Sequence, residues 1–177
     1  MAMPGSPLSE DPIAAARRQW IAHGWESAAE GMAAVTSVMR AQQIMIARVE
    51  QVLRPYQLSF ARYELLMLLL FSRGGALPMN KASSRLQVHP TSITNAVDRL
   101  QSAGLVFREP HPTDRRTTLI KITDPGRELA GRATEAMNRE VFEQPGLPDE
   151  RLQQLVQTLA LLRRDAGDYR DGTGPGA

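Results

Sequence analysis

Between residues 59 and 122 the hydrophobic pattern changes from a helical period to alternation, and this change restricts the fold more than any other feature. Apolar residues spaced three and four apart predict a helix from Ser59, a short helix over 81–88 and a helix over 90–103 that Gly104 ends. Residues 105–109 and 117–122 flank a polar turn, and the second run alternates and is rich in β-branched residues. We therefore expect a mainly α fold with a small β-hairpin (α+β).

The flanking segments predict further helices. Pro12 is suited to open a helix that breaks near Gly24, and a long amphipathic pattern follows from Met32 to about residue 55. A helix of this length with one apolar stripe usually needs a partner surface. Asp124 begins a helical pattern that runs to about Phe142, and another amphipathic pattern covers residues 152–162.

Charge is unevenly spread along the 177 residues. The net charge is only +2, yet residues 79–127 carry eight Lys or Arg against four Asp or Glu, and the remainder is slightly acidic. This distribution suits a binding face for a polyanion, although ordinary variation in composition produces a similar excess.

Several classes of function are excluded by what the sequence lacks. There is no cysteine, and the three histidines have no metal-binding spacing, so we expect no metal site and no cofactor. No nucleophile–base pairing or phosphate loop is visible, which argues against an enzyme. No apolar run is long enough to span a bilayer and no signal-peptide pattern opens the chain, so we expect a cytoplasmic protein without membrane contact.

The helix over 90–103 has a polar face that is suited to DNA. Ile93, Val97 and Leu100 share its inward side. The candidate DNA-binding residues are the polar ones that remain outside: Thr91, Ser92, Thr94, Asn95 and Arg99. Asn pairs well with adenine and Arg with guanine, whereas the alternative is a solvated helix surface. Two helices joined by a tight turn are the parts of a helix-turn-helix.

The hairpin turn strengthens the DNA interpretation. Arg115 and Arg116 lie next to each other on a projecting loop, where arginine can enter a narrow minor groove. Asp114 suits an intramolecular role, bracing the wing by orienting an arginine. The alternative is a solvated turn.

At these residues the chain resembles the MarR family of bacterial regulators. The resemblance rests on four runs in the order and spacing of that family: Ala96-Val97-Asp98-Arg99-Leu100, Ala103-Gly104-Leu105-Val106, Pro112-Thr113-Asp114-Arg115-Arg116 and Ile122-Thr123-Asp124-Pro125-Gly126. It implies a homodimeric winged helix-turn-helix, often a repressor, with Arg116 in the minor groove. Many members of the family release DNA when a small aromatic acid or a phenolic compound binds.

The resemblance also implies a domain organisation. We expect a disordered N-terminal arm over 1–11, N-terminal dimerisation helices over 12–55, a winged helix-turn-helix DNA-binding domain over 56–123, C-terminal dimerisation helices over 124–166 and a disordered tail over 167–177. An effector pocket under the long helix would be lined by residues such as Met32, Val35, Met39, Tyr63 and Met67. The same methionines would also suit an ordinary core or dimer interface.

Three aromatic positions keep open interpretations. His89 stands where such helices usually carry Ser, and it suits a cap, a phosphate contact or simple exposure, of which we favour exposure. Trp20 and Trp25 lie in an N-terminal extension, and packing is a better interpretation of Trp20 than a ligand wall. A helical dimeric interaction protein without specific DNA binding remains the alternative to a DNA-binding regulator.

Overall fold

The computed structural model describes residues 8–114 and 116–169. The chain divides into two compact units, residues 1–137 and 138–177. The helices of the first unit are α1 (Pro12–Ala22), α2 (Glu26–Leu53), α3 (Phe60–Leu70), α4 (Met79–Leu86), α5 (Pro90–Ser102) and α6 (Asp124–Met137), with short 3-10 turns at Arg54–Tyr56 and Arg73–Gly75. Its strands are β1 (Ala76–Pro78), β2 (Val106–Pro110) and β3 (Thr118–Ile122).

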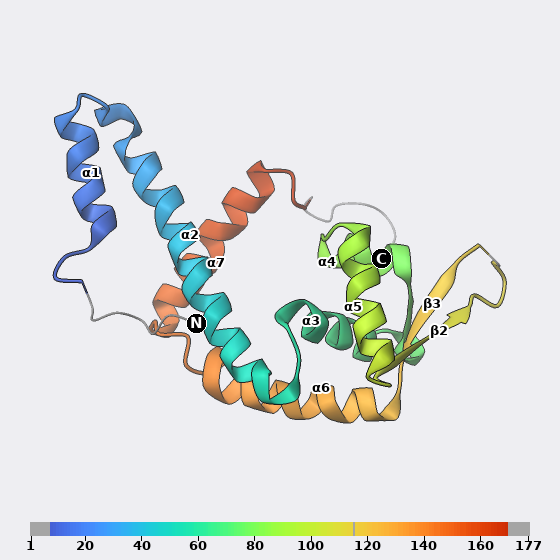
Figure 1. Ribbon diagram of the computed structural model, residues 1–177. Helices are drawn as coiled ribbons and strands as arrows, with labels where there is room; N and C mark the ends of the chain where they lie inside the picture. Colours follow the sequence, from blue (N-terminus) through green and yellow to red (C-terminus); the bar gives the residue numbers. More distant parts are fainter. Residues whose placement is uncertain (1–7, 115, 170–177) are drawn as a thin grey trace. The chain divides into compact units, whose positions relative to one another are not determined.

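Helices α1 and α2 form an antiparallel hairpin (Figure 1). Pro12 occupies the first helical position, and the Asp11 carboxylate accepts a hydrogen bond from the Ile13 N–H at 3.0 Å, so α1 starts where the sequence predicts. The break at Gly24 is also confirmed, since its φ of +79° is a conformation that glycine adopts freely. Trp20 and Trp25 meet edge to face across this turn, with ring centroids 5.4 Å apart.

The core of the first unit lies among α3, α5, α6 and the sheet. Its fully buried side chains come from helices and strands alike: Leu53, Leu65, Leu66, Leu69, Val97, Leu100, Val106, Ile120 and Met137. Ser59 caps α3, as its position predicts, by accepting a hydrogen bond from the Arg62 N–H. This core fixes the direction of α5 relative to the hairpin.

The sheet has three strands in the order β1-β3-β2, all antiparallel. The predicted hairpin is β2–β3, with Val106 opposite Ile122 and Pro110 opposite Thr118. Strand β1 adds to the far side of β3, where Leu77 pairs with Ile120 and is buried in the core. The expected fold class, mainly α with a small β-hairpin, is confirmed.

Thr123 joins the hairpin to α6. Its N–H donates to the Leu105 carbonyl at 3.0 Å, and its hydroxyl donates to the Gly104 carbonyl at 2.8 Å. The same hydroxyl accepts from the Gly126 N–H at 3.1 Å, which caps α6. A Cβ on Gly126 would stand 2.2 Å from the Leu105 oxygen, so the close approach of helix and strand requires glycine there.

The long α2 helix starts at Glu26, six residues before the clear periodicity, and exposes much of its apolar stripe. Val49, Val52 and Leu53 are buried at its C-terminal end. Apolar side chains farther along α2 are exposed: Val35, Val38, Met39, Ile44 and Met45.

The second unit contains α7 (Asp149–Asp165), which is preceded by a π-helical turn at Asn138–Phe142. The regular part of α6 therefore stops at Met137, five residues before the predicted end. Val156, Leu161 and Leu162 are exposed on α7. The Tyr169 hydroxyl donates to the Ala160 carbonyl at 3.1 Å and fastens the end of this unit. No helix in the described part of the chain is long and apolar enough to cross a membrane.

Candidate nucleic-acid interface

Helix α5 presents an exposed polar face. Ile93, Ala96, Val97 and Leu100 are buried on its inner side. All five predicted DNA-binding residues of the helix are exposed on the other side: Thr91, Ser92, Thr94, Asn95 and Arg99. The 3.6-residue period places them together, so hydroxyl, amide and guanidinium groups occupy one helix surface.

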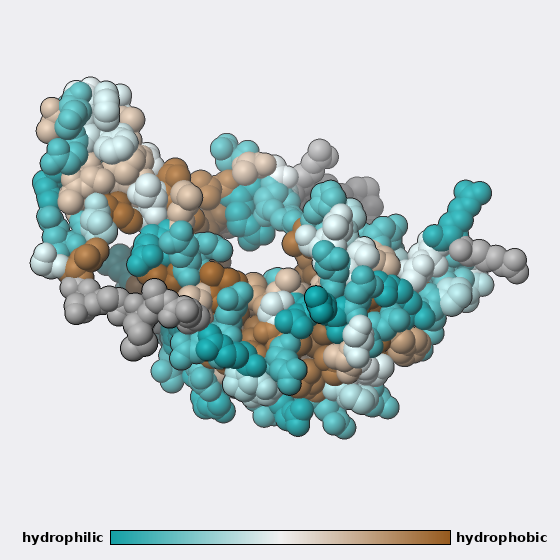
Figure 2. Space-filling model, in the orientation of Figure 1, coloured by the Kyte–Doolittle hydropathy of each residue, from teal (hydrophilic) through white to brown (hydrophobic). Residues whose placement is uncertain are grey.

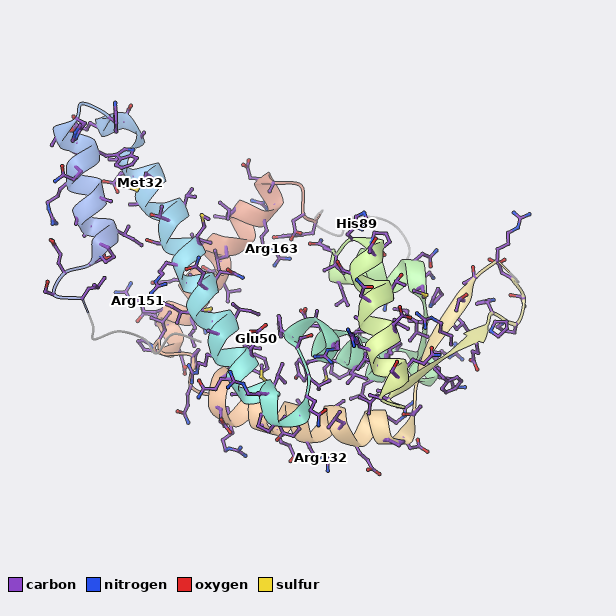
Figure 3. All side chains as sticks on the ribbon, viewed as in Figure 1. Met32, Glu50, His89, Arg132, Arg151 and Arg163 are labelled. Atoms are coloured by element: carbon purple, nitrogen blue, oxygen red, sulfur yellow. The ribbon has the colours of Figure 1, made fainter. Side chains whose placement is uncertain are left out.

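His89 both caps α5 and is exposed. Its Nδ1 accepts a hydrogen bond from the Thr91 N–H at 3.3 Å and lies 3.1 Å from the Thr91 hydroxyl. Figure 3 shows His89 at the start of the helix. Imidazole therefore does here what Ser does at many helix starts, and the capping and exposure interpretations both hold.

A tight turn joins α4 to α5. Gln87 adopts a left-handed conformation with φ of 51°, which ends α4. The Ser83 hydroxyl then donates to the Val88 carbonyl at 2.7 Å, and the Val88 N–H donates to the Ser83 carbonyl at 3.3 Å. These bonds hold the two helices in a helix-turn-helix arrangement.

The β2–β3 hairpin projects as a hydrophilic extension at the right of Figure 2. In its turn, Asp114 Oδ1 accepts from the backbone N–H of Arg116 at 3.0 Å and Oδ2 accepts from the Thr117 hydroxyl at 2.7 Å. These two bonds, with the Thr117 bond first, lower the pKa of Asp114. Asp114 thus braces the turn through the Arg116 backbone and the Thr117 hydroxyl. The expectation that it also orients an arginine side chain stays a prediction, because Arg115 is one of the two candidates. Arg116 is exposed, whereas Arg115 lies outside the described residues.

A link between the hairpin and α5 has no counterpart in the sequence pattern. Arg108 on β2 donates to Asp98 Oδ1 at 2.6 Å and to Gln101 Oε1 at 2.9 Å. The helical period places Asp98 on the outer side of α5 but indicates no partner for it. Its spacing from Arg108 gives no signal, because the hairpin brings the two together only in three dimensions.

Two hollows lie beside α5. The first, of about 590 Å³, is lined by residues of α5 and of the start of α3: Ser59, Ala61, Arg62, Ser92, Asn95, Ala96 and Arg99. The second, of about 750 Å³, runs from there to α6. The predicted DNA-binding residues Ser92, Asn95 and Arg99 therefore line a concave surface that also includes Arg62, which the sequence did not single out.

Comparison with known proteins identifies the family. The sequence matches the MarR family over residues 56–117. In structure, it resembles Sco5413, a MarR-family transcriptional regulator from Streptomyces coelicolor, with 47% identity and a TM-score of 0.73 over 80% of this chain and 99% of that one. This chain belongs to the MarR family.

Two further proteins match at lower identity. YhbI of Bacillus subtilis, an HTH-type transcriptional regulator, is 32% identical over 48% of this chain and 53% of its own. CouR of Rhodococcus jostii, solved with p-coumaroyl-CoA bound, is 28% identical, with a TM-score of 0.58 over 69% of this chain and 85% of its own. The chain spans about half the length of the curated relatives named first among its matches.

The residues predicted for a MarR-type effector pocket divide into two groups. Met32, Val35 and Met39 lie on the N-terminal half of α2, where Val35 and Met39 are both 59% exposed. Figure 3 marks Met32 far along α2 from α3. Since a helix rises 1.5 Å per residue, Met32 lies about 30 Å from the buried end of α2.

Tyr63 and Met67 form the second group, on α3. The Tyr63 hydroxyl lies 3.1 Å from Thr134 Oγ1, and that oxygen also lies 3.1 Å from Met67 Sδ. The single chain does not bring the two groups into one pocket, because α2 meets α3 only near its C-terminal end. A shared pocket stays a prediction.

Proposed function

We propose that this chain is a sequence-specific DNA-binding regulator of transcription that acts in the cytoplasm as a homodimeric repressor. The observation that carries this proposal is the pairing of an exposed polar helix face on α5 with a projecting basic hairpin, held in one frame by Arg108. An α-helix fits the major groove of B-DNA, and a loop arginine fits a narrow minor groove.

Different residues would have different roles. Asn95 suits direct reading of a base edge, and Arg99 suits either guanine or phosphate. Thr91, Ser92 and Thr94 suit base edges or phosphates beside the first turn of α5, where free N–H groups and the helix dipole favour anions. Arg116 would enter the minor groove, with Arg115 beside it and Asp114 holding the turn in shape.

Exposed apolar surface supports the homodimer. Met39, Ile44 and Met45 on α2, and Leu161 and Leu162 on α7, are each about half exposed in the single chain. Large apolar side chains that stay exposed on a helix are typical of interaction surfaces, and each of the two helices carries such side chains. A two-fold dimer would bind a pseudo-palindromic operator with half-sites about 34–36 Å apart. A dimer seated on a promoter would block transcription, which is why we favour repression.

Release by a small aromatic ligand is the finer part of the proposal. CouR, solved with p-coumaroyl-CoA bound, supports a ligand with an aromatic acyl group, although that ligand is larger because it carries coenzyme A. An inducer must bind the DNA-free form more tightly than the DNA-bound form. A compound that binds equally well with and without operator would therefore not be an inducer.

Titration into labelled DNA from upstream of its own gene, with a scrambled duplex alongside, tests the proposal. Specific affinity should exceed non-specific affinity by about 10³-fold or more at physiological salt and should fall steeply as salt rises. Asn95→Ala should relax preference at particular base pairs, whereas Arg116→Ala should weaken binding to most sequences. No binding even at low salt would favour the alternative, a dimeric interaction protein.

A further inference from the structure

Three arginines, one on α5 and two on the helices beside it, have no carboxylate partner among the described residues: Arg99, Arg62 and Arg132. Other arginines of the chain are neutralised locally, such as Arg17 by Glu30, Arg18 by Glu10 and Arg163 by Asp168. Three unneutralised guanidinium groups on one surface form a site for an anion.

The two hollows connect these arginines. Both are lined by Arg62 and Arg99, and the second continues to Arg132 on α6. The residues that line the second hollow include amide, hydroxyl and guanidinium groups but no carboxylate: Pro55, Tyr56, Gln57, Leu58, Arg62, Arg99, Leu100, Ser102, Ala103, Leu105, Leu129 and Arg132. The positive surface therefore runs without interruption from the outer face of α5 to α6.

The surface changes where it reaches α2, and the side chain of Arg62 is held in place. A third hollow, which shares Arg62, is lined by both Glu50 and Arg54, so a carboxylate joins the lining where the surface reaches α2. Arg62 is held in place because its Nε donates to the Ser59 hydroxyl at 3.2 Å, which leaves its terminal nitrogens for a ligand. Figure 3 shows Glu50 on α2 and Arg132 on α6 as separate points on this unit.

The position of the three arginines relative to α5 indicates which anion they would bind. The major groove of B-DNA is about 12 Å wide, and an α-helix with its side chains is about 10–12 Å across, so a helix that fills the groove has sugar-phosphate strands against both flanks. Arg108 bonds to Asp98 and Gln101, whereas Arg99 lines the hollows that it shares with Arg62 and Arg132. The 3.6-residue period places Asp98 and Gln101 on one flank of α5 and Arg99 on the other. A series of negative charges is thus expected beside the three arginines whenever α5 occupies the groove.

We infer that Arg62, Arg99 and Arg132 form a phosphate track, which binds the DNA strand on the flank of α5 opposite the wing and extends the interface onto α3 and α6. This inference rests on the proposed function. The track contacts phosphates and not bases, so it sets affinity and register and contributes little to sequence preference. It also places α6, which the sequence assigned only to dimerisation, in the DNA interface.

The test is the salt dependence of DNA binding by Arg62→Gln and Arg132→Gln, each measured on the operator and on a scrambled duplex. Removing one phosphate interaction should lower the slope of log K against log salt by about 0.9, so the fall in affinity between 50 and 200 mM salt should shrink by about 3.5-fold for each arginine replaced. Both duplexes should be affected by a similar factor. Arg62→Lys should restore most of the slope, since it keeps the charge.

Arg18→Gln is the matched control, because it removes the same charge at a position on α1. Among the described residues, Arg18 forms an ion pair with Glu10. This variant should keep the parental slope. A parental slope in both Arg62→Gln and Arg132→Gln, with folding verified by thermal melting, would overturn the phosphate track while leaving the proposed function intact. If the parent protein itself binds neither duplex, the proposed function fails first.

Discussion

Arg108 in β2 bonds to Asp98 in α5, with 2.6 Å between the guanidinium nitrogen and the carboxylate oxygen. A second nitrogen of the same guanidinium donates to Gln101 one turn further along α5. The planar, forked geometry of arginine fixes the angle between its two acceptors. The hairpin and the helix therefore present their exposed residues as one surface, with the polar face of α5 and the hairpin turn at a set spacing.

Arg108→Gln should lower the affinity for operator DNA more than it lowers stability. The Arg108 side chain is 27% exposed and that of Asp98 is 56% exposed, so the ion pair should contribute no more than about 1 kcal/mol to the free energy of unfolding. Urea unfolding and DNA titration of Arg108→Gln, Asp98→Asn and the double variant would measure the coupling. Additive effects on DNA affinity would contradict a joint role.

Gly126→Ala should destabilise the protein by about 1–3 kcal/mol. The new Cβ would stand 2.2 Å from the Leu105 carbonyl oxygen, where backbone cannot easily give way. Gly131→Ala is the control on the same helix, because nothing lies within 4 Å of its added Cβ. That variant should be neutral or more stable by up to about 1 kcal/mol, since alanine favours helix. Equal effects of the two variants on the urea midpoint would exclude the steric explanation.

Glu64→Gln should raise stability at neutral pH. Burial raises the pKa of the Glu64 carboxyl, so ionising it costs more in the folded chain than in the unfolded one, where the pKa is about 4.3. This cost is absent below the unfolded pKa and develops as pH rises through the higher folded pKa. Unfolding at pH 4 and pH 7 should show the gain only at pH 7. Glu128→Gln, on an exposed position of α6, should show no gain at either pH.

Asp114→Asn should weaken DNA binding without a large change in overall stability. The substitution replaces one carboxylate oxygen by an amide nitrogen, which donates and does not accept. One acceptor oxygen then remains for the Arg116 N–H and the Thr117 hydroxyl, which the carboxylate binds through separate oxygens. Because hydrogen bonding lowers the pKa of Asp114, the brace is intact above the unfolded pKa of about 3.9 and is lost as pH falls through the lower folded pKa. Amide exchange at Arg116, whose N–H donates to Asp114 Oδ1, should therefore accelerate in Asp114→Asn at pH 6, where the parent turn is intact. Unchanged exchange would argue against bracing.

Local chemistry explains which parts of the fold were predictable. Ser59, Gly24 and Pro12 mark helix ends through their own backbone preferences, and the spacing of Ile93, Val97 and Leu100 identifies the buried face of α5. The strand β3 follows from alternation in the same way. Each of these signals lies within a few residues of what it predicts.

Contacts between distant segments explain what was missed. Neither the Arg108–Asp98 pair nor the approach of Arg62 to Arg99 leaves a spacing that a single sequence reveals, since both depend on how α5 packs against other elements. For the expected pocket around Met32 and Tyr63, the sequence suggested a shared site that the single chain does not assemble. Its residues share a chemical type, yet the length of α2 separates them within one chain.

The joint at Thr123 has a mechanical consequence. Four hydrogen bonds meet at this residue, including one from the Arg127 N–H to its carbonyl at 2.9 Å, and Gly126 sits against the Leu105 carbonyl with no space between. Because these contacts are close, the hairpin cannot tilt independently of α6. A displacement of the wing therefore rotates the N-terminal turn of α6 in the same direction, which couples the movement of the hairpin to that of the helix.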